Sequence, residues 1–469
     1  MLFPTIQFAI FFVVVLTANW LLLPHRRQWK LFMLGASWFF YGSWNWRVVF
    51  LIIASTLLNQ AAAVLMDRSR DERSRRLVLA GAVAANLGII AWFKYYGFFV
   101  TSIINFFRTF GIDVPLPLLE ITLPVGISFF TFQAMSYVID VYRGRETPAP
   151  LLDFAVYLAF FPQLVAGPIV RSTEFIPQMY TRKDPRRVDA AGGFALIVGG
   201  LFKKVVVANT LAGAIVDPMF ASPSQFTALE VLVGVYGYAV QIYADFSGYT
   251  DIAIGVARLM GFRFPHNFDN PYTALSIQDF WRRWHMTLSR WLRDYLYIPL
   301  GGKRGSRATT YRNLMLTMLL GGLWHGAAWT FVIWGGYHGA LLAWERWRTE
   351  TRARPEPDTP GRRTLRRLAT FHLVCLGWIL FRADSMGRVG EILSRLLDWG
   401  PAPSVTPAVL ALVIGGIGVQ FIPSDLRVSL VDSFSRLRPA AMTAALALAL
   451  LLLDGLGPEG VAPFIYCQF

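Results

Sequence analysis

The sequence predicts an all-α polytopic membrane protein, and three observations support this fold class. Of its 469 residues, 55% are hydrophobic and only 16% are charged, whereas a soluble domain carries about 25% charged residues. The chain contains 16 Trp, 17 Tyr and 37 Phe, and aromatic rings favour the interface between lipid headgroups and hydrocarbon. The third observation is a series of apolar runs separated by basic loops.

The apolar runs set the expected number of helices. Each span needs about 20 apolar residues, so the chain predicts a bundle of about 10–13 tilted transmembrane and re-entrant helices. Several runs are shorter than a full span and are expected to be re-entrant, tilted or interfacial. The runs lie at 6–24, 31–43, 48–66, 77–93, 97–111, 121–139, 154–170, 192–215, 226–258, 313–345, 369–381, 406–423 and 440–454.

The net charge of +15 is mostly confined to loops, which indicates contact with anionic lipid rather than with nucleic acid. Loops without Lys or Arg near 113–120, 217–225 and 400–405 are predicted to face away from the cytoplasm. Between 77 and 170 the orientation stays open, because basic residues occur on both sides. The loops predicted to be cytoplasmic lie at 25–30, 68–76, 182–187, 303–312 and 346–367.

We expect one membrane domain over residues 1–469. It comprises a bundle over 1–349 that holds the polar motifs, a proline-containing cytoplasmic loop at 350–366, and C-terminal spans over 367–469. No internal repeat is evident, which counts mildly against a secondary transporter.

His325 is the first candidate for chemistry. Its apolar stretch, 313–343, is too short for two spans of about 20 residues each, yet both flanking loops are basic. A hairpin broken near Gly321, Gly322 and Gly326 reconciles these facts and places His325 deep in the protein, where irregular backbone is tolerated only against protein or a cavity. A neutral imidazole there can act as a general base or as a transient nucleophile. A packed histidine bonded to a carbonyl explains the position equally well.

The second candidate is His285, within segment 279–295. At the helical period, Trp281, Trp284, His285 and Leu288 share one face, flanked by arginines. An interfacial anchor helix explains the Trp and Arg content. It does not explain a histidine on the apolar face, so a place for His285 in a site is an even alternative.

Asp245 and Asp251 are acids inside an apolar run. They can form the wall of a reaction cavity, or a structural ion pair with Arg258 or Arg290, and the ion pair is slightly preferred. Among the other histidines, His338 is predicted to be structural. His266 is predicted to be a turn residue, and His25 and His372 are predicted to be structural.

Several function classes find no support. The sequence has no Gly-x-Ser-x-Gly elbow, no His-Glu-x-x-His helix and no Walker loop. Its two cysteines, Cys375 and Cys467, have no metal-ligand spacing. We therefore predict no metal site and no tightly bound cofactor.

Seven segments, in the same order, resemble the membrane-bound O-acyltransferase family, and within it the bacterial alginate O-acetylase branch. They cover most of the chain, and their combination is far more specific than any one alone. The segments are 93–96 (FKYY), 123–129 (LPVGISF), 161–169 (FPQLVAGPI), 243–249 (YADFSGY), 280–285 (FWRRWH), 322–326 (GLWHG) and 463–466 (PFIY).

This resemblance implies a ring of tilted helices around a thin centre in the bacterial inner membrane. It implies that His325 is the catalytic histidine and that His285 occupies the second polar position. An acyl group, from acetyl-CoA in this branch, crosses from the cytoplasm to a periplasmic SGNH-type partner that acts on an exported polysaccharide beside its export machinery. Other acceptors in the family, namely peptidoglycan, cellulose, teichoic acid or a lipid, and a non-catalytic transporter remain alternatives.

Further site candidates accompany the two histidines. The expected substrate or cavity residues are Trp281, Trp284, Ser289, Tyr243, Asp245, Ser247 and Trp324. The basic loop after segment 279–295 offers candidate contacts for the phosphates of CoA, although ordinary positive-inside charge is the preferred explanation. These basic candidates are Lys303, Arg304 and Arg307.

Overall fold

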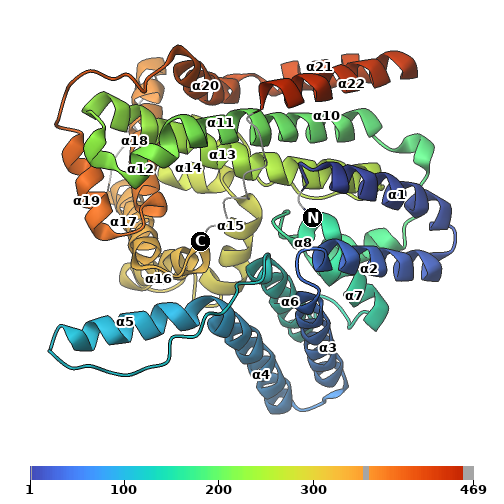
Figure 1. The fold of residues 1–469 in the computed structure, drawn as a ribbon. Coiled ribbons are helices and arrows are strands. Elements are labelled where there is room, and N and C mark those ends of the chain that lie inside the picture. The colour runs from blue at the N-terminus through green and yellow to red at the C-terminus, as the bar shows by residue number, and fades with distance from the viewer. Residues whose placement is uncertain (2, 352–358, 458–469) are drawn as a thin grey trace. The chain divides into compact units, whose positions relative to one another are not determined.

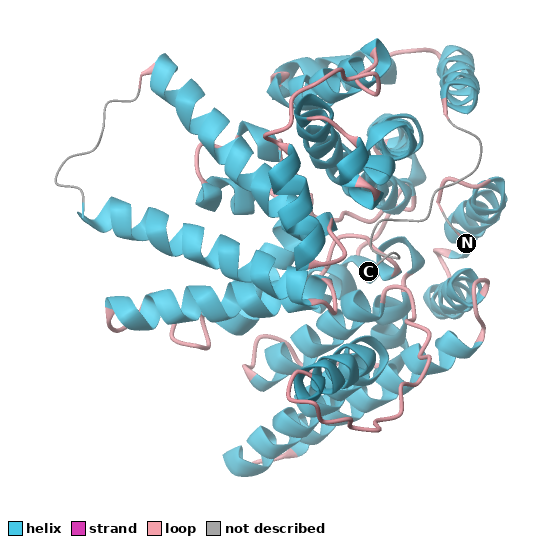
Figure 2. Cartoon of the chain, turned by 60° about the vertical axis from the view of Figure 1, so that its left-hand side comes forward, coloured by secondary structure: helices cyan, strands magenta, loops and turns pink. Residues whose placement is uncertain are grey.

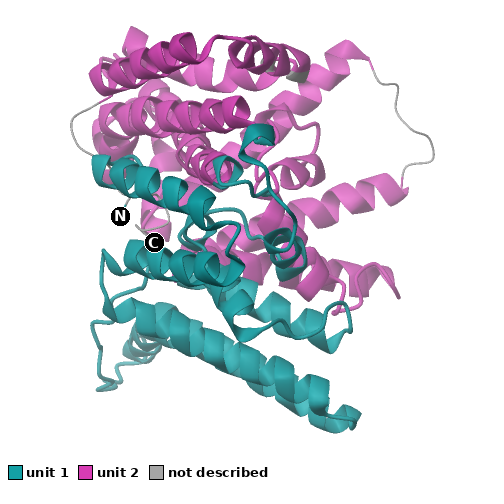
Figure 3. Cartoon of the chain, turned by 90° about the vertical axis from the view of Figure 1, so that its right-hand side faces the viewer, with its two compact units in different colours: residues 1–188, 257–264 teal, residues 189–256, 265–469 magenta. Residues whose placement is uncertain are grey.

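The structure is a computed structural model that describes residues 1, 3–351 and 359–457. Within those ranges every regular element is a helix and no strand occurs (Figure 2). The expected all-α class is therefore confirmed. The chain divides into two compact units (Figure 3): Met1–Val188 with Ala257–Phe264, and Asp189–Val256 with Pro265–Phe469.

The first unit contains α1 to α9 (Figure 1). Its helix α6 is buried along nearly its whole length, because aromatic and small polar side chains cover every face. After α4, a π-helical turn at Ala91–Tyr95 leads into α5. The bounds are α1 Ile6–Leu22, α2 Arg26–Gly42, α3 Arg47–Arg68, α4 Glu72–Ile90, α5 Tyr96–Arg108, α6 Ile127–Tyr142, α7 Leu151–Ala159, α8 Phe161–Leu164 and α9 Ser172–Phe175.

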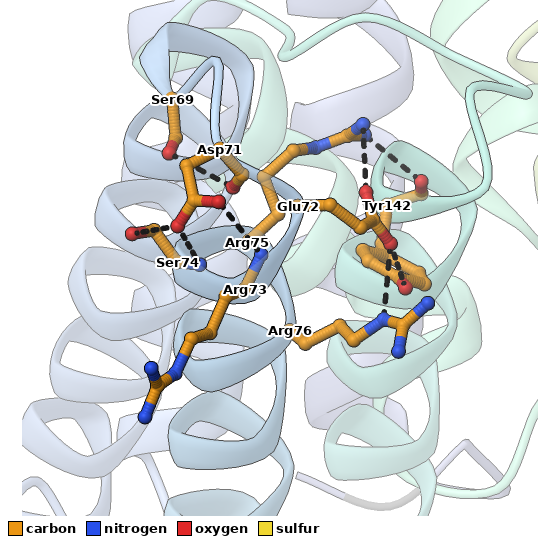
Figure 4. A network of polar contacts seen from close by, with 8 residues as sticks. All are labelled: Ser69, Asp71, Glu72, Arg73, Ser74, Arg75, Arg76 and Tyr142. Atoms are coloured by element: carbon orange, nitrogen blue, oxygen red, sulfur yellow. Dashed lines mark hydrogen bonds and ion pairs between the residues drawn. The ribbon is translucent and has the colours of Figure 1, made fainter.

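A polar network joins the start of α4 to the end of α6 (Figure 4). The Glu72 carboxylate accepts hydrogen bonds from the Tyr142 hydroxyl at 2.6 Å and from Arg76 Nε at 3.1 Å. Arg75 donates to the Tyr142 carbonyl oxygen at 3.0 Å. An acidic side chain at a helix N-terminus also complements the helix dipole.

This network extends the predicted orientation to a segment that the charge count leaves open. It places the C-terminal end of α6, and with it Arg143 and Arg145, beside the basic loop 68–76. Both segments therefore lie on the side that the positive-inside rule assigns to the cytoplasm.

Five described helical segments are long and apolar enough to cross a membrane, which confirms a multi-pass membrane protein. Two shorter apolar segments, Ile6–Leu22 and Pro407–Phe421, accompany them. The total of about 10–13 transmembrane and re-entrant helices stays a prediction. The five segments are Arg47–Arg68, Glu72–Arg108, Ala190–Ala221, Pro360–Arg382 and Pro439–Leu456.

The second unit contains α10 to α22. Only the last three residues of α13 belong to the first unit. The bounds are α10 Ala190–Leu201, α11 Asn209–Leu211, α12 Asp217–Ala221, α13 Ala228–Leu259, α14 Ile277–Arg283, α15 Met286–Leu292, α16 Arg307–His325, α17 Trp329–Thr351, α18 Pro360–Arg382, α19 Met386–Arg395, α20 Pro407–Gly418, α21 Ser424–Ser435 and α22 Pro439–Leu456.

The segment expected to be a loop, 350–366, is helical at both ends. Helix α17 extends to Thr351 and α18 begins at Pro360. Its proline-containing middle, 352–358, lies outside the described residues.

Glycines bring α10 and α13 into direct backbone contact. A Cβ on Gly200 would lie 2.5 Å from the carbonyl oxygen of Gly248, and one on Gly255 would lie 2.6 Å from that of Gly193. Small residues commonly allow such close approach in membrane bundles. This contact positions the polar side chains of α13.

The hairpin that the short apolar stretch predicts is present as α16 and α17, which pack side by side (Figure 1). The chain turns at Gly326–Ala328. Gly321 and Gly322, expected at the break, instead lie inside α16. A Cβ on Gly322 would approach the Phe331 carbonyl oxygen to 2.3 Å, so that glycine serves helix packing rather than helix breaking.

Replacement of Gly335 by alanine is expected to destabilise the protein by about 1–3 kcal/mol, in the range of overpacked cores. The new Cβ would lie 2.3 Å from the Met318 carbonyl oxygen, which is backbone and cannot rotate away. Thermal unfolding in detergent micelles measures the change. The neighbouring Gly336→Ala is the matched control, because its Cβ meets only Leu319 Cδ2 at 3.4 Å. Equal unfolding temperatures for both variants would contradict this account.

Candidate functional site

His325 is the last residue of α16 and is only 2% exposed. Its imidazole contacts the rings of Trp334 on α17 and Phe381 on α18, with centroids 5.1 and 5.3 Å away. The next residue, Gly326, must be glycine, because a Cβ there would lie 2.0 Å from the Phe331 ring. The tight turn thus places His325 at a helix end within an aromatic enclosure.

His285 lies at a second break, which corrects the expectation of one amphipathic helix over 279–295. Helix α14 ends at Arg283, Trp284 is extended, and His285 has φ 42° and ψ 54°. Left-handed backbone is costly for a residue with a side chain, and such strain concentrates at functional sites. The predicted buried face survives nevertheless: Trp284 is 1% exposed and His285 is fully buried.

Asn267 stabilises this break by replacing the lost helical acceptors. Its backbone carbonyl accepts from the Met286 N–H at 2.9 Å. Its side-chain Oδ1 accepts from the Thr287 N–H at 3.2 Å, from the Thr287 hydroxyl at 2.9 Å, and from His285 Nδ1 at 3.2 Å. A backbone N–H can only donate, so Oδ1 is the acceptor and His285 carries its proton on Nδ1. Its Nε2 is therefore the acceptor nitrogen.

The two breaks bring the two histidines together. The ring centroids of His285 and His325 are 6.3 Å apart. Trp324 lies 6.0 Å from the His285 ring, and Phe246 on α13 lies 4.7 Å from it, edge to face. Residues 40 positions apart in the sequence thus form one buried pair with aromatic walls.

An open cavity of about 1710 Å³ reaches this region. Met286 and Thr287, which directly follow His285, are among its lining residues, as are the predicted residues Trp281 and Ser289. Trp281 also connects the cavity to the histidine pair, since its ring lies 5.6 Å from that of Trp334.

Arginines dominate the charge of this cavity. Two glutamates also line it, and one of them, Glu345, accepts from the N–H groups of Ile277 and Gln278 at 2.6 and 3.0 Å. This contact caps α14 from α17 and holds the cavity wall in place. The lining arginines are Arg282, Arg290, Arg293, Arg346, Arg348, Arg362 and Arg366.

The acids of α13 form ion pairs, as the preferred interpretation expects. Asp245 pairs with Lys204 and Asp251 with Lys203, because α10 and its π-helical continuation Phe202–Ala208 pack on α13 and present lysines. Pairing with Arg258 or Arg290 stays a prediction.

Four other predicted substrate or cavity residues are Trp284, Ser247, Tyr243 and Asp245. Trp284 packs between Trp378 and Phe268, with ring centroids 4.9 and 5.0 Å away. Ser247 accepts from Lys203 at 3.2 Å, and Tyr243 packs on Phe268. Neither Ser247, Tyr243 nor Asp245 lines the large cavity, so substrate contacts for these three stay predictions.

The basic residues of loop 303–307 do not line the cavity themselves, although Arg307 pairs with Glu350, which does. Arg307 is 3.5 Å from Glu350, and neither it nor Lys303 or Arg304 is among the lining residues. Their contact with CoA phosphates stays a prediction. Among the described residues, no group of three or more His, Cys, Asp or Glu side chains could hold a metal ion.

Two residues that contact the histidine pair escape the sequence pattern. Asn267 reads as a turn residue, because asparagine is common in turns. Trp334 reads as a core or interface aromatic. Only the fold brings Asn267 to His285 across 18 positions.

Replacement of Asn267 by alanine is expected to lower the stability by about 1–3 kcal/mol, because buried donors lose their acceptor. Any activity that uses His285 should fall with it, since the imidazole loses its orienting bond. Thermal unfolding and an activity assay on the same preparation test both effects. Asp269→Ala is the matched control in the same loop, where the side chain is exposed. An unchanged unfolding temperature for Asn267→Ala would contradict this role.

Comparison with known proteins agrees with this geometry. Residues 124–379 match the model of the membrane-bound O-acyltransferase family. A probable alginate O-acetylase of Azotobacter vinelandii is 41% identical over 85% of this chain and 79% of its own length. One of Pseudomonas putida is 38% identical over 95% of this chain and 96% of its length.

A peptidoglycan O-acetyltransferase of Helicobacter pylori is 36% identical over 78% of this chain and 73% of its own length. The matched region contains both helix breaks and both buried histidines. This membership favours an enzyme over a non-catalytic transporter. The chain therefore belongs to the membrane-bound O-acyltransferase family and is a multi-pass membrane acyltransferase.

Proposed function

We propose that this protein transfers an acetyl group from cytoplasmic acetyl-CoA across the bacterial inner membrane, for O-acetylation of an exported polysaccharide such as alginate. The observation that carries the proposal is the pair of buried histidines at two helix breaks, 6.3 Å apart, beside an open arginine-rich cavity. The named activities of the similar proteins agree with acetyl transfer.

His325 acts as the general base in this proposal. An acceptor hydroxyl attacks the carbonyl carbon of the thioester, and its proton passes to the imidazole of His325. The tetrahedral intermediate then expels the thiolate of CoA, and His325 returns the proton to that sulfur. One C–O bond forms and one C–S bond breaks, so the products are the ester and free CoA.

His285 orients the acceptor hydroxyl. Because Asn267 holds the proton of His285 on Nδ1, Nε2 can accept a hydrogen bond from a hydroxyl group. The left-handed backbone of His285 aims this ring toward His325. The two imidazoles thereby hold one hydroxyl between them.

The arginine-rich cavity is the entrance for the donor. The phosphates of CoA carry several negative charges, and guanidinium groups bind phosphates through charge-assisted, bidentate hydrogen bonds. A volume of about 1710 Å³ exceeds the 300–1,000 Å³ range typical of ligand sites, so it accommodates a long donor. Trp281 lies where the thioester end would reach the histidines.

The acceptor lies outside the cytoplasm in this proposal. We infer a periplasmic SGNH-type acetyltransferase as the partner that receives the acetyl group and passes it to the polymer near the export machinery. Peptidoglycan is the second candidate acceptor, because a named peptidoglycan O-acetyltransferase is 36% identical to this chain.

His325→Ala is expected to lower acetyl transfer by about 10²–10⁴-fold, the range for loss of general acid–base catalysis. Release of free CoA from acetyl-CoA by purified protein in lipid vesicles, with a small alcohol or the partner present, measures the rate. His372→Ala is the control, because that imidazole bonds to the Tyr236 hydroxyl and the Leu368 carbonyl, at 2.7 Å each. Wild-type turnover by folded His325→Ala protein would refute the proposal.

Arg282→Gln and Arg290→Gln are expected to raise KM for acetyl-CoA about tenfold, because each loses a charge-assisted bond to phosphate. The kcat should change little, since these groups bind ground and transition states alike. The exposed Arg73→Gln controls for general loss of charge. The triple variant K303Q/R304Q/R307Q tests the other basic group. A raised KM in the triple variant alone would move the phosphate contacts to that loop.

A further inference from the structure

The arginine-rich cavity ends beside the buried histidines without including them. Neither His285 nor His325 is among its lining residues. The cavity does reach Met286 and Thr287, which directly follow His285, and Met318 on α16. A donor held in this cavity therefore needs a path from its inner end to the imidazole of His325.

One face of α16 leads from the cavity to His325. Leu314 and Met318 line the cavity, and His325 follows Met318 by seven positions, which is almost two helical turns. Because successive residues are about 100° apart, these three side chains share a face, and Gly321 lies on that face between Met318 and His325. The face that borders the cavity thus continues to the histidine, and a glycine occupies the turn between them.

The surroundings of Gly321 leave room on this face. Although Gly321 is buried, a Cβ there would meet a single described atom within 4 Å beyond its own helix, Leu292 Cδ1 at 3.2 Å. The next residue differs, because a Cβ on Gly322 would lie 2.3 Å from the Phe331 carbonyl oxygen and 3.1 Å from Gly335 Cα. Gly322 is thus fixed by helix packing, whereas Gly321 faces one flexible side chain.

Leu292 separates the cavity from the space at Gly321. It is the last residue of α15, its side chain is 9% exposed, and it lines the cavity. The chain continues from it into a π-helical turn at Arg293–Tyr297, and such turns are frequent at functional sites. The end of a leucine side chain can change rotamer without a shift of the backbone, so this contact can open.

We propose that Leu292 and Gly321 form a constriction through which the acyl group of the donor passes to His325, and that it admits only narrow, unbranched acyl groups. The inference rests on the proposed function, in which acetyl-CoA enters through this cavity. The acyl end enters first, because the arginines of the cavity hold the phosphates. Leu292 is therefore a specificity-determining residue: an acetyl group passes its side chain, and a branched acyl group collides with it.

Leu292→Ala tests the width of the constriction. The ratio of kcat/KM for isobutyryl-CoA to kcat/KM for acetyl-CoA is expected to rise about tenfold or more, the effect of one or two carbon atoms in an apolar pocket. The ratio is informative because partial loss of folded protein lowers both rates equally. CoA release from each thioester by the full chain in lipid vesicles measures it. Leu319→Ala is the matched control, because Leu319 is a half-buried residue of α16 that does not line the cavity.

Gly321→Ala tests the same constriction by narrowing it. Acetyl transfer is expected to fall at least tenfold with little change in unfolding temperature, because the new methyl group opposes only the end of Leu292. Gly336→Ala is the matched control, since its Cβ likewise meets one leucine methyl group, Leu319 Cδ2 at 3.4 Å. The double variant Gly321→Ala/Leu292→Ala should recover acetyl transfer, because the two groups no longer compete for one space.

The outcomes distinguish this inference from the proposed function. An unchanged ratio in folded Leu292→Ala protein, or wild-type acetyl transfer in folded Gly321→Ala protein, would overturn the constriction. Either result leaves the proposed function intact where His325→Ala is inactive in the same assay. Transfer that persists in His325→Ala would instead overturn the proposed function itself.

Discussion

The site depends on Asn267, whose oxygens accept hydrogen bonds from the residues around the break at His285. A break at His285 leaves backbone N–H groups without helical acceptors, and away from water such groups are costly. Asn267 supplies two oxygens, one from the backbone to Met286 and one from the side chain to Thr287 and His285. The same contact therefore permits the left-handed turn, aims the imidazole and selects its tautomer.

The second break, at His325, depends on packing rather than on a polar cap. Helices α16 and α17 approach so closely that Gly322 and Gly335 admit no Cβ, and the turn at Gly326 closes against the Phe331 ring. Both histidines thus sit at helix ends whose geometry other elements impose. Rigid support of this kind is what an acid–base pair needs, because small displacements weaken proton transfer steeply.

Ion pairs stabilise the helix that packs beside the left-handed backbone of His285. The ion pairs of Lys203 and Lys204 with Asp251 and Asp245 join α13 to the helix packed on it. Lys204 and Asp245 are buried, and removal of one partner from a buried pair costs more than the pair itself contributes. The acids of α13 thus hold the wall beside His285, which Phe246 of the same helix contacts.

The sequence by itself determined the all-α membrane class, the hairpin, the family and the two histidines, because hydropathy, loop charge and ordered motifs are local properties. It also predicted the burial of Trp284, His285 and Leu288, although it did not show the break at His285. The tertiary structure alone decided that break, the lysine partners of Asp245 and Asp251, and the arginines that line the cavity. Each of these features depends on which distant segment supplies a hydrogen-bond acceptor, an opposite charge or a packing surface. The periodicity of one segment does not show which segments pack against it.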